Sequence, residues 1–546
     1  MGSPTLLTVV AAAAVHCVVS PLPEVSLEQY VVPYLLGNLI LCSYLWKEGL
    51  PTVDIIFSFT TINACFIFTS VILTITRRLF FSPLAKFPGP KLAAISGFWN
   101  ANEGRLGRAS RTRKALHDQF QSDIIRIGPN ELSVNRVDAI ERLYGKDYKR
   151  GTFTPVFNIS GGDNLVTQRD NQLHSVWRRM WVKAFNKDKF SDYLNRIQSH
   201  VNKAVRLLHE KAGNPVECGK FLDALTFDVI SDVAFSQDTK FQDGAGDRSL
   251  IDGIHIFVPM IPVLGNLPHL QQICRYLPEP PAGRKFSEYR GQVLAARKSL
   301  KGQPNDIFAH LEVPDASTGI RMRPIDLKQH ILFMMIVGAH SVGTTLTRTL
   351  AVLASQPHVQ SSIRQELNEV FHGEGSAPVE TIRKLKYLDC VVREALRMFA
   401  PVTDGTPVIV PKGGITLESG SFIPGGTQVW VGQYVIMFNE EYFPRPHEFL
   451  PEGGWMSLGD EGYGKEGELV KDRRAWIPFG YGFHSCGGRA LAIEELKQIL
   501  LRFVMEFDIR FVEHEDMPFQ YEHWADSWKD YFLAMIDEIE LRFVPR

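Results

Sequence analysis

The 546-residue chain has little cysteine, and its cysteines are not arranged as a framework. There are seven, an odd number, with no CxxC pair and no close cysteine–histidine cluster. This usage disfavours a secreted disulfide scaffold and a structural zinc site, and it suits a reducing compartment in which one thiol has a special role. An excess of positive charge is also missing, because 59 Lys and Arg face 60 Asp and Glu. The charge balance therefore gives no indication of nucleic-acid binding.

Repeats and low-complexity tracts are absent as well, and the composition is that of a globular protein with 45% hydrophobic and 22% charged residues. Wholesale disorder is thereby excluded. Phenylalanine is abundant, with 35 residues, which indicates a large apolar interior or a cavity for an apolar ligand.

The first part of the chain is apolar in three stretches, 6–19, 30–46 and 55–75. The third has 21 residues without a charge, which is long enough to cross the hydrocarbon core of a bilayer. Arg77 and Arg78 follow directly and place its C-terminal end in the cytosol. A cleaved signal peptide fits poorly, because the first basic residue is Lys47. We therefore expect residues 1–76 to be a membrane anchor with one to three transmembrane helices.

A basic and proline-rich segment, 77–95, follows the anchor and contains Pro88-Gly89-Pro90. Proline fixes φ and stops helices, so this segment is predicted to be a stiff hinge before a catalytic domain over 96–546. Apolar periodicity predicts helices over 191–212 and 378–399, among others. Glycine- and proline-rich turns within 408–430 predict short strands there.

The most informative stretch is an apolar, glycine-rich loop that leads to Cys486, with a predicted helix directly after it. The positive end of a helix favours a thiolate, and glycines let the backbone approach a large flat group. Phe479 and Trp476 could cover the sulfur. These are the requirements of a thiolate ligand to haem iron, whereas the alternative is a buried structural cysteine in a turn.

The spacing of five residues resembles the haem-binding signature of the cytochrome P450 family, Phe-x-x-Gly-x-[Arg/His]-x-Cys-x-Gly. They are Phe479, Gly482, His484, Cys486 and Gly488. The resemblance extends over most of residues 83–546. It implies the cytochrome P450 fold, mainly α with a small β-rich part, and haem b as cofactor with Cys486 as the axial iron ligand.

Four further residues match motifs of that family. Glu394 and Arg397 match its Glu-x-x-Arg pair, and their i,i+3 spacing lets them meet on one helix face. His174 and Arg178 resemble the helix that contacts a haem propionate, and His484 would be a third contact. The alternatives are a solvated surface pair and an exposed basic face.

Arg179 is better interpreted as exposed. With three lysines it could form a basic patch for an acidic redox partner. These lysines are Lys183, Lys187 and Lys189.

The sequence departs from the family pattern at the oxygen-activation site of the central helix. Alignment on Gly338 places His340 at the position where the family usually has an acidic residue, and Ser341 at the position where it usually has threonine. The resemblance implies that Ser341 supplies the alcohol and that His340 relays protons, whereas a lone histidine in an apolar helix is also compatible with ordinary packing. Two family arginines are missing as well, at Val408 and at Gly453, where Arg445 and His447 are nearby candidates for a replacement.

The resemblance implies a membrane-anchored haem-thiolate monooxygenase that oxidises an apolar small molecule with O₂. The N-terminus and hinge resemble those of fungal members, many of which act in terpenoid or polyketide biosynthesis. The implied partners are an NADPH–cytochrome P450 reductase, with cytochrome b5 as a second candidate, and membrane lipid, but no nucleic acid. The implied location is the endoplasmic reticulum membrane, with the catalytic domain in the cytosol.

Two other functions stay open at this point. Loss of the acid at His340 is compatible with a haem-thiolate isomerase, dehydratase or peroxide-dependent enzyme. A non-catalytic haem-binding membrane protein is the third hypothesis.

Overall fold

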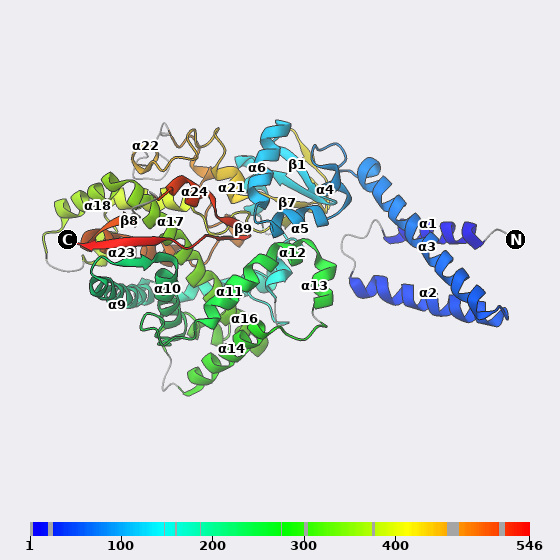
Figure 1. Ribbon diagram of the computed structural model, residues 1–546, viewed down its shortest axis with the longest axis horizontal. Helices are drawn as coiled ribbons and strands as arrows, with labels where there is room; N and C mark the ends of the chain where they lie inside the picture. Colours follow the sequence, from blue (N-terminus) through cyan, green and yellow to red (C-terminus); the bar gives the residue numbers. More distant parts are fainter. Residues whose placement is uncertain are drawn as a thin grey trace.

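The computed structural model describes residues 4–19, 26–146, 148–158, 161–185, 187–274, 276–299, 304–373, 377–455, 469–512 and 519–546. Three helices at the N-terminus project from one side of a larger body (Figure 1). In that body most described residues are helical and the sheets are small, so the predicted fold class is confirmed.

The projecting part consists of α1 (Pro4–Val19), α2 (Leu27–Lys47) and α3 (Thr52–Thr76), which continues into a short π-helix, η1 (Arg77–Phe81). Each predicted apolar stretch is helical. No residue of α3 is buried, which suits a helix surrounded by lipid. Helix α2 begins with a capping box, in which the Ser26 hydroxyl accepts from the Gln29 N–H and the Gln29 side chain accepts from the Ser26 N–H.

Among the described residues, three helical stretches are long and apolar enough to cross a membrane: Thr52–Phe81, Ser249–Asn266 and Pro324–Ser355. The last two belong to the larger body, where 44% and 78% of their most apolar windows are buried. Their apolar side chains are therefore at least partly explained by packing in the protein core. Helix α1 is apolar but shorter, with the stretch Leu6–Val19.

The hinge is held against the first strand of the body. The N–H of Arg126, in β1 (Ile124–Gly128), donates to the Pro88 carbonyl at 2.7 Å. Gly89 lies so close that an added Cβ would be 2.2 Å from the Arg126 carbonyl oxygen, so only glycine fits there. The Arg126 guanidinium in turn donates to the Arg78 carbonyl at 2.8 Å.

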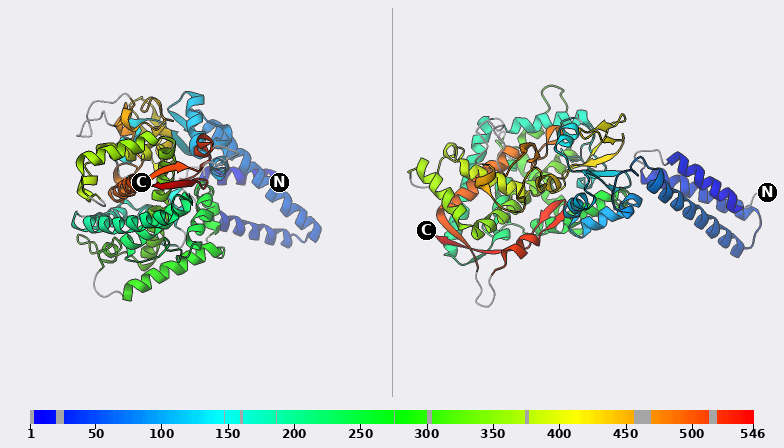
Figure 2. Two further views of the ribbon diagram at one scale, coloured as in Figure 1. Left: turned by 60° about the vertical axis from the view of Figure 1, so that its left-hand side comes forward. Right: turned by 90° about the horizontal axis from the view of Figure 1, so that it is seen from above.

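The body is built mainly from helices, which both views in Figure 2 show packed against one another. Before the long central helix they are α4 (Lys91–Ile95), α5 (Phe98–Arg105), α6 (Ala109–Phe120), α7 (Val137–Tyr144), η2 (Thr154–Phe157), α8 (Asn171–Ala184), α9 (Lys187–Lys211), α10 (Cys218–Phe235), α11 (Ser249–Phe257), η3 (Val258–Met260), α12 (Ile261–Asn266), α13 (Pro268–Cys274), α14 (Pro281–Ser299) and α15 (Ala309–Glu312).

The central helix is α16 (Pro324–Met335), a π-helical turn η4 (Ile336–His340) and α17 (Ser341–Ser355). After it come α18 (Pro357–Val370), α19 (Val379–Ile382), α20 (Lys386–Met398), α21 (Gln433–Met437), α22 (Pro451–Gly454), η5 (Arg473–Ala475), η6 (Gly482–His484), α23 (Arg489–Glu506) and α24 (Tyr521–Asp526).

The helix predicted over 378–399 is two helices, α19 and α20. The second one starts afresh because its first N–H groups have a partner from another helix. The Glu366 carboxylate of α18 accepts from the N–H groups of Tyr387 and Leu388, at 2.7 and 3.1 Å. The positive N-terminal end of the α20 dipole also stabilises this carboxylate. The other predicted helix, 191–212, lies within α9.

The sheets are short. The largest has the order β1-β2-β7-β4, with β2 (Glu131–Val134) parallel to β7 (Gln428–Trp430) and antiparallel to β1, and with β4 (Val408–Ile409) at its edge. The stretch 408–430 forms four strands, as its turns predicted. The remaining strands are β3 (Pro215–Glu217), β5 (Ile415–Thr416), β6 (Phe422–Ile423), β8 (Phe507–Phe511), β9 (Lys529–Tyr531), β10 (Leu533–Met535) and β11 (Glu540–Pro545).

Two apolar cores hold the body together. The larger joins α8, α9, α10, the central helix, α20 and α23. The smaller packs α7 and α21 onto the four-stranded sheet. The cysteine loop is next to both, because Trp476 contacts both cores and Phe479 contacts the larger one.

Candidate functional site

A cavity of about 310 Å³ lies between the central helix and the loop that carries Cys486. Its walls are largely apolar and come from α8, α10, α11, α12, the central helix and the segment 401–406. Phe532, the turn residue between β9 and β10, also lines the cavity and has a left-handed backbone with φ of +77°. Its ring lies 5.4 Å from Phe153 and 5.0 Å from Phe157. A cavity of this kind suits an apolar ligand.

The cysteine loop is shaped by glycine. Gly482 has φ of +62°, and an added Cβ would be 2.0 Å from the carbonyl oxygen of Tyr144. Any side chain there would push the loop away from α7, so the motif needs glycine at this point. The Cys486 N–H donates to the Phe479 carbonyl at 2.8 Å, and α23 begins three residues after the thiol.

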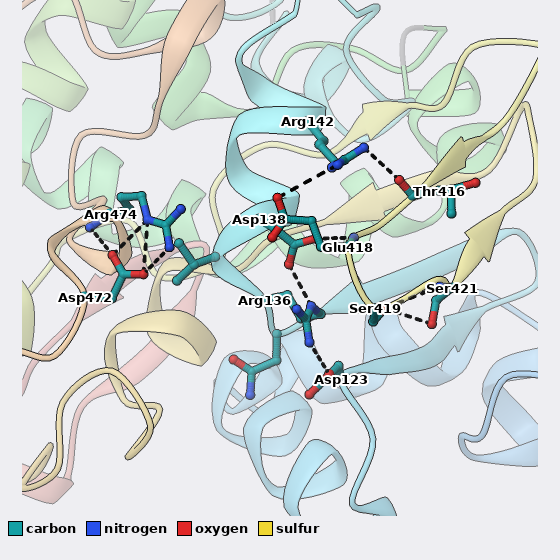
Figure 3. Close-up of polar contacts among 12 residues, drawn as sticks. Asp123, Arg136, Asp138, Arg142, Thr416, Glu418, Ser419, Ser421, Asp472 and Arg474 are labelled. Carbon is teal, nitrogen blue, oxygen red and sulfur yellow. Dashed lines mark hydrogen bonds and ion pairs between the residues drawn. The ribbon is translucent and has the colours of Figure 1, made fainter.

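Helix α7, which supports this loop, is itself fixed by ion pairs (Figure 3). Arg136 bridges Asp138 at 2.7 Å and Asp123 at 3.0 Å, and the Asp138 carboxylate accepts from the Glu418 N–H at 2.8 Å. Arg142 donates to the Thr416 carbonyl at 3.0 Å. These contacts join α7 to the β5–β6 hairpin and hold the surface on which Gly482 rests.

The Cys486 side chain is open to the cavity, although it lies deep among other protein atoms. Burial among the surrounding atoms raises the pKa of its thiol. The backbone N–H groups of Gly488 and Arg489 and the positive charge of Arg178 oppose that rise. The groups that stabilise a thiolate are therefore in place around Cys486, and they act against the effect of burial.

The three predicted propionate contacts, His174, Arg178 and His484, lie together on the cavity wall. The rings of His174 and His484 are 4.8 Å apart. Arg178 also holds the cysteine loop, because its guanidinium donates to the Ser485 carbonyl at 2.7 Å and to the Ser485 hydroxyl at 2.9 Å.

Both histidines keep an unused ring nitrogen. Within the described part of the chain, neither nitrogen of His174 has a hydrogen-bond partner, and Nδ1 of His484 has none, while His484 Nε2 donates to the Tyr148 carbonyl at 3.0 Å. Burial and the charges of Arg150 and Arg178 lower the pKa of His174 to about 3. A buried ring with two unpartnered nitrogens indicates a polar ligand on this side of the cavity.

Arg150 completes this polar wall and was not anticipated from the sequence. It is 3% exposed, lines the cavity and donates to the Thr406 hydroxyl at 2.8 Å, while its Nε has no partner among the described residues. Burial lowers its pKa to about 9. Its backbone pairs with Val408, the position at which a family arginine is missing. No motif surrounds Arg150, so only the fold brings it here.

Glu394 and Arg397 form a buried ion pair, with 5% and 2% of their side chains exposed and two hydrogen bonds of 2.8 Å. The arginine also donates to the carbonyls of Met437, Pro446 and Glu448.

Trp455 adds a further hydrogen bond to this pair. Its indole N–H donates to Glu394 at 2.9 Å. Of the two candidates from the sequence, Arg445 pairs with Glu448 and His447 packs on the ring of Phe438. The side-chain surroundings of Gly453 lie outside the described residues.

His340 and Ser341 point in different directions from the π-helical turn. Ser341 lines the cavity, and its hydroxyl donates to the Val337 carbonyl. His340 does not belong to the described cavity wall. Its Nε2 lies 3.1 Å from the Ala534 carbonyl and must carry the hydrogen, because a carbonyl only accepts. Burial and the neighbouring His255 lower the pKa of His340 to about 4.

The comparisons with known proteins agree with this geometry. The family model "Cytochrome P450" matches residues 127–529. "Cytochrome P450 67" of Uromyces fabae is 28% identical over 487 residues, which cover 86% of this chain and 87% of that protein. "Trichothecene C-15 hydroxylase" of Fusarium sporotrichioides is 27% identical over 497 residues, with 87% and 96% covered.

A crystal structure of the cytochrome P450DA heme domain has the same fold, with a TM-score of 0.66 at 17% identity over 82% of this chain and 95% of that one. The family match spans well over half of the chain and includes the cysteine loop and most of the cavity wall, which extends beyond it to Phe532 and Leu533. The chain belongs to the cytochrome P450 family, and it is accordingly a haem-dependent oxidoreductase of the monooxygenase type.

Proposed function

We propose that this monooxygenase is a membrane-anchored enzyme of fungal secondary metabolism that oxidises an apolar terpenoid or polyketide, with Cys486 as the axial ligand of haem b. The observation that carries the proposal is one largely apolar cavity whose described lining includes a single thiol, that of Cys486. Arg150 and His174, which line another part of the wall, have nitrogens without a hydrogen-bond partner among the described residues. When bound, haem supplies the oxygen chemistry with O₂ and electrons from an NADPH–cytochrome P450 reductase.

The residues present fit such a group. Gly487 and Gly488 leave the floor beside Cys486 open, since an added Cβ would meet nothing closer than 3.8 Å. Arg150 and Arg178 are cations without a described acid beside them, and His174 has a ring N–H without a partner. Two carboxylates at one edge of a flat apolar ring would satisfy these donors, whereas the free Nδ1 of His484 donates only when that ring is protonated. In this proposal Phe479 covers the sulfur and keeps water out.

Arg150 offers a direct test of that edge. Arg150→Leu is expected to weaken haem binding by about 3 kcal/mol, which is on the order of 100-fold in affinity. The reason is that a buried carboxylate of the haem would lose its positively charged partner. Titration of the apoprotein with haemin measures this change, and Arg150→Lys, which keeps the charge, is the matched control. Haem affinity that stays the same in Arg150→Leu would mean that no carboxylate sits there.

The names of two fungal relatives support a monooxygenase, and one of them also names a substrate. The Fusarium relative is named as a trichothecene hydroxylase, and a protein of Aspergillus versicolor that is 29% identical over 486 residues is named "Cytochrome P450 monooxygenase notG'". Co-expression with an NADPH reductase and apolar precursors, followed by product analysis, tests the proposal. Product that forms without NADPH and O₂ would contradict it and favour an isomerase or dehydratase.

The electron donor would dock on the side of α8 that faces away from the cavity. Arg179 and Lys183 are about half exposed there, but both lie beside the buried Asp315 carboxylate, at 3.0 and 4.0 Å. The side chains of Lys187 and Lys189 lie outside the described residues. The patch proposed for a reductase, or for cytochrome b5, is therefore partly neutralised by Asp315.

For oxygen activation we propose that the Ser341 hydroxyl is the proton donor at the cavity. We propose that His340, which points away from the cavity, passes protons to it. Ser341→Ala is expected to lower coupled turnover on the order of 10²-fold and to divert NADPH to hydrogen peroxide, whereas Ser341→Thr is nearly neutral. The measurement is NADPH and O₂ consumed per product formed.

His340 needs two variants, because it can act by proton transfer or by its bond to Ala534. His340→Gln keeps a donor for that carbonyl, and His340→Ala removes it. If His340 relays protons, both variants lose coupling. If glutamine restores the coupling that alanine loses, the proton relay is refuted and the hydrogen bond is the function.

We further propose that residues 1–76 anchor the protein in the endoplasmic reticulum membrane with the catalytic domain, 96–546, in the cytosol. The apolar, unburied α3 and the arginines after it support this orientation. Carbonate extraction is expected to leave the full-length protein in the membrane, while a chain that starts at Ser82 still binds haem and is released much more readily. Equal release of the two chains would contradict a spanning helix.

A further inference from the structure

The second apolar helix does more than contribute to an anchor, because its first turn contacts the catalytic body. Helix α2 starts beside α13, which packs next to α12 in the wall of the cavity. The Leu27 N–H of α2 donates to the Gln272 side chain of α13 at 2.6 Å. This N–H is one of the first four of its helix and has no intrahelical acceptor, so the tertiary contact satisfies it.

Two further contacts join the same elements. The Tyr276 hydroxyl, two residues after α13, donates to the Glu28 carboxylate at 2.6 Å. The ring of Tyr30 meets the ring of His269 edge to face at 5.8 Å. We call these three contacts the latch. Glu28 is also favoured by its place in the first turn of α2, next to the positive end of the helix dipole.

A second face of α13, about 100° around the helix from Gln272, contacts the cavity wall. The Gln271 side chain, 8% exposed, donates to the Pro155 carbonyl of η2. Phe157, at the end of η2, lines the cavity and packs against Phe532. Gln271 and Gln272 are consecutive, so one short helix connects the anchor on one side with the cavity wall on the other.

The anchor is thereby attached to the body at two separate places. One is the hinge, where Arg126 holds the Arg78 carbonyl at 2.8 Å and Arg78 donates to the Ile95 carbonyl. The other is the latch. A single hinge would let the body swing about it, whereas two attachments fix the angle between the anchor helices and the body (Figure 1).

The exposed face of this region is apolar. Five large apolar side chains of α11–α13 and the residues that follow are between 38% and 62% exposed: Ile256, Met260, Leu270, Ile273 and Leu277. Tyr276 and Tyr30, the two tyrosines of the latch, are of the kind that concentrates at the boundary between lipid and water. These features agree with a latch that lies at the membrane surface.

We propose that the latch makes α2 a structural brace for α13, which holds the cavity wall at η2 in place and fixes the tilt of the catalytic body on the membrane. This extends the proposed anchor, whose only function so far is attachment. It predicts that breaking the latch loosens α13 and η2 even though every residue of the cavity is unchanged.

The experiment is amide hydrogen exchange of the full-length protein in phosphatidylcholine nanodiscs. Gln272→Leu and Tyr276→Phe each remove one hydrogen bond of the latch. Each is expected to speed exchange in α13 roughly fivefold, and both together roughly 25-fold, with a smaller increase in residues 154–157. Tyr34→Phe is the matched control, because the Tyr34 hydroxyl donates to Asn63 at 2.6 Å within the anchor itself.

Unchanged exchange in α13 of the double variant would overturn the brace. Faster exchange in α13 without any change at 154–157 would overturn its connection to the cavity wall. An increase in Tyr34→Phe as large as that in the latch variants would show that general loosening of the anchor is the cause. The readout uses neither haem chemistry nor substrate, so a failure of the proposed monooxygenase function would be seen separately.

Discussion

Cys486→Ser is expected to abolish the thiolate type of reduced carbon-monoxide spectrum completely and to leave no coupled monooxygenation. Cys486 is the cysteine of the chain that lines the cavity, and the hydroxyl of serine neither ionises near neutral pH nor donates electron density as a thiolate does. The measurement is the position of the Soret band of the reduced, carbonylated protein, together with product per NADPH.

The other cysteines provide the control. Cys390 is buried, and its pKa is raised to about 12 by burial and by the nearby Asp389, so it is a structural thiol. Cys390→Ser can cost stability but should keep the spectrum. A thiolate spectrum that survives in Cys486→Ser would show that a different residue binds the iron.

Loss of the Glu394 carboxylate should have the largest effect on stability. Glu394→Ala leaves the buried guanidinium of Arg397 without its counter-charge, at a cost of about 3–5 kcal/mol. Since native domains are stable by only about 5–15 kcal/mol, most of the folded protein and its haem content should be lost. The fraction of soluble, haem-containing protein and the midpoint of urea unfolding measure this.

Two further variants separate the charge effect from packing. Trp455→Phe removes only one hydrogen bond to Glu394 and should cost about 1–2 kcal/mol. Replacing both Glu394 and Arg397 with methionine should be less harmful than Glu394→Ala, because no unpaired charge remains. A double replacement that is worse than the single one would show that the carbonyl contacts of Arg397 matter more than its pairing with Glu394.

Short-range patterns in the sequence were sufficient for the fold class, and they singled out a cysteine that lies on the cavity wall. Its role as an iron ligand remains a proposal. The glycines and the cysteine stand close together in the chain, and their chemistry depends on local backbone geometry, as the hydrogen bond from the Cys486 N–H to the Phe479 carbonyl illustrates. The predicted propionate contacts also lie on one wall of the cavity. What they bind remains a proposal.

Contacts between distant segments could not be predicted. Arg150 reaches the cavity only because its backbone pairs with β4, more than two hundred residues later in the chain. The break between α19 and α20 depends on Glu366 from another helix. The direction of His340 follows from the π-helical turn, since one extra residue in a helical turn rotates everything after it.

The left-handed backbone of Phe532 has a consequence for how this cavity can diversify among related enzymes. Holding a bulky residue at φ of +77° costs about 1–2 kcal/mol, which the contacts of its ring with Phe153 and Phe157 offset. A glycine there would relieve the strain and remove the aromatic wall in the same step. One substitution of Phe532 would therefore both enlarge the cavity for a bulkier substrate and relax the backbone. At most positions a mutation that changes activity costs stability, and at this position that cost is reduced.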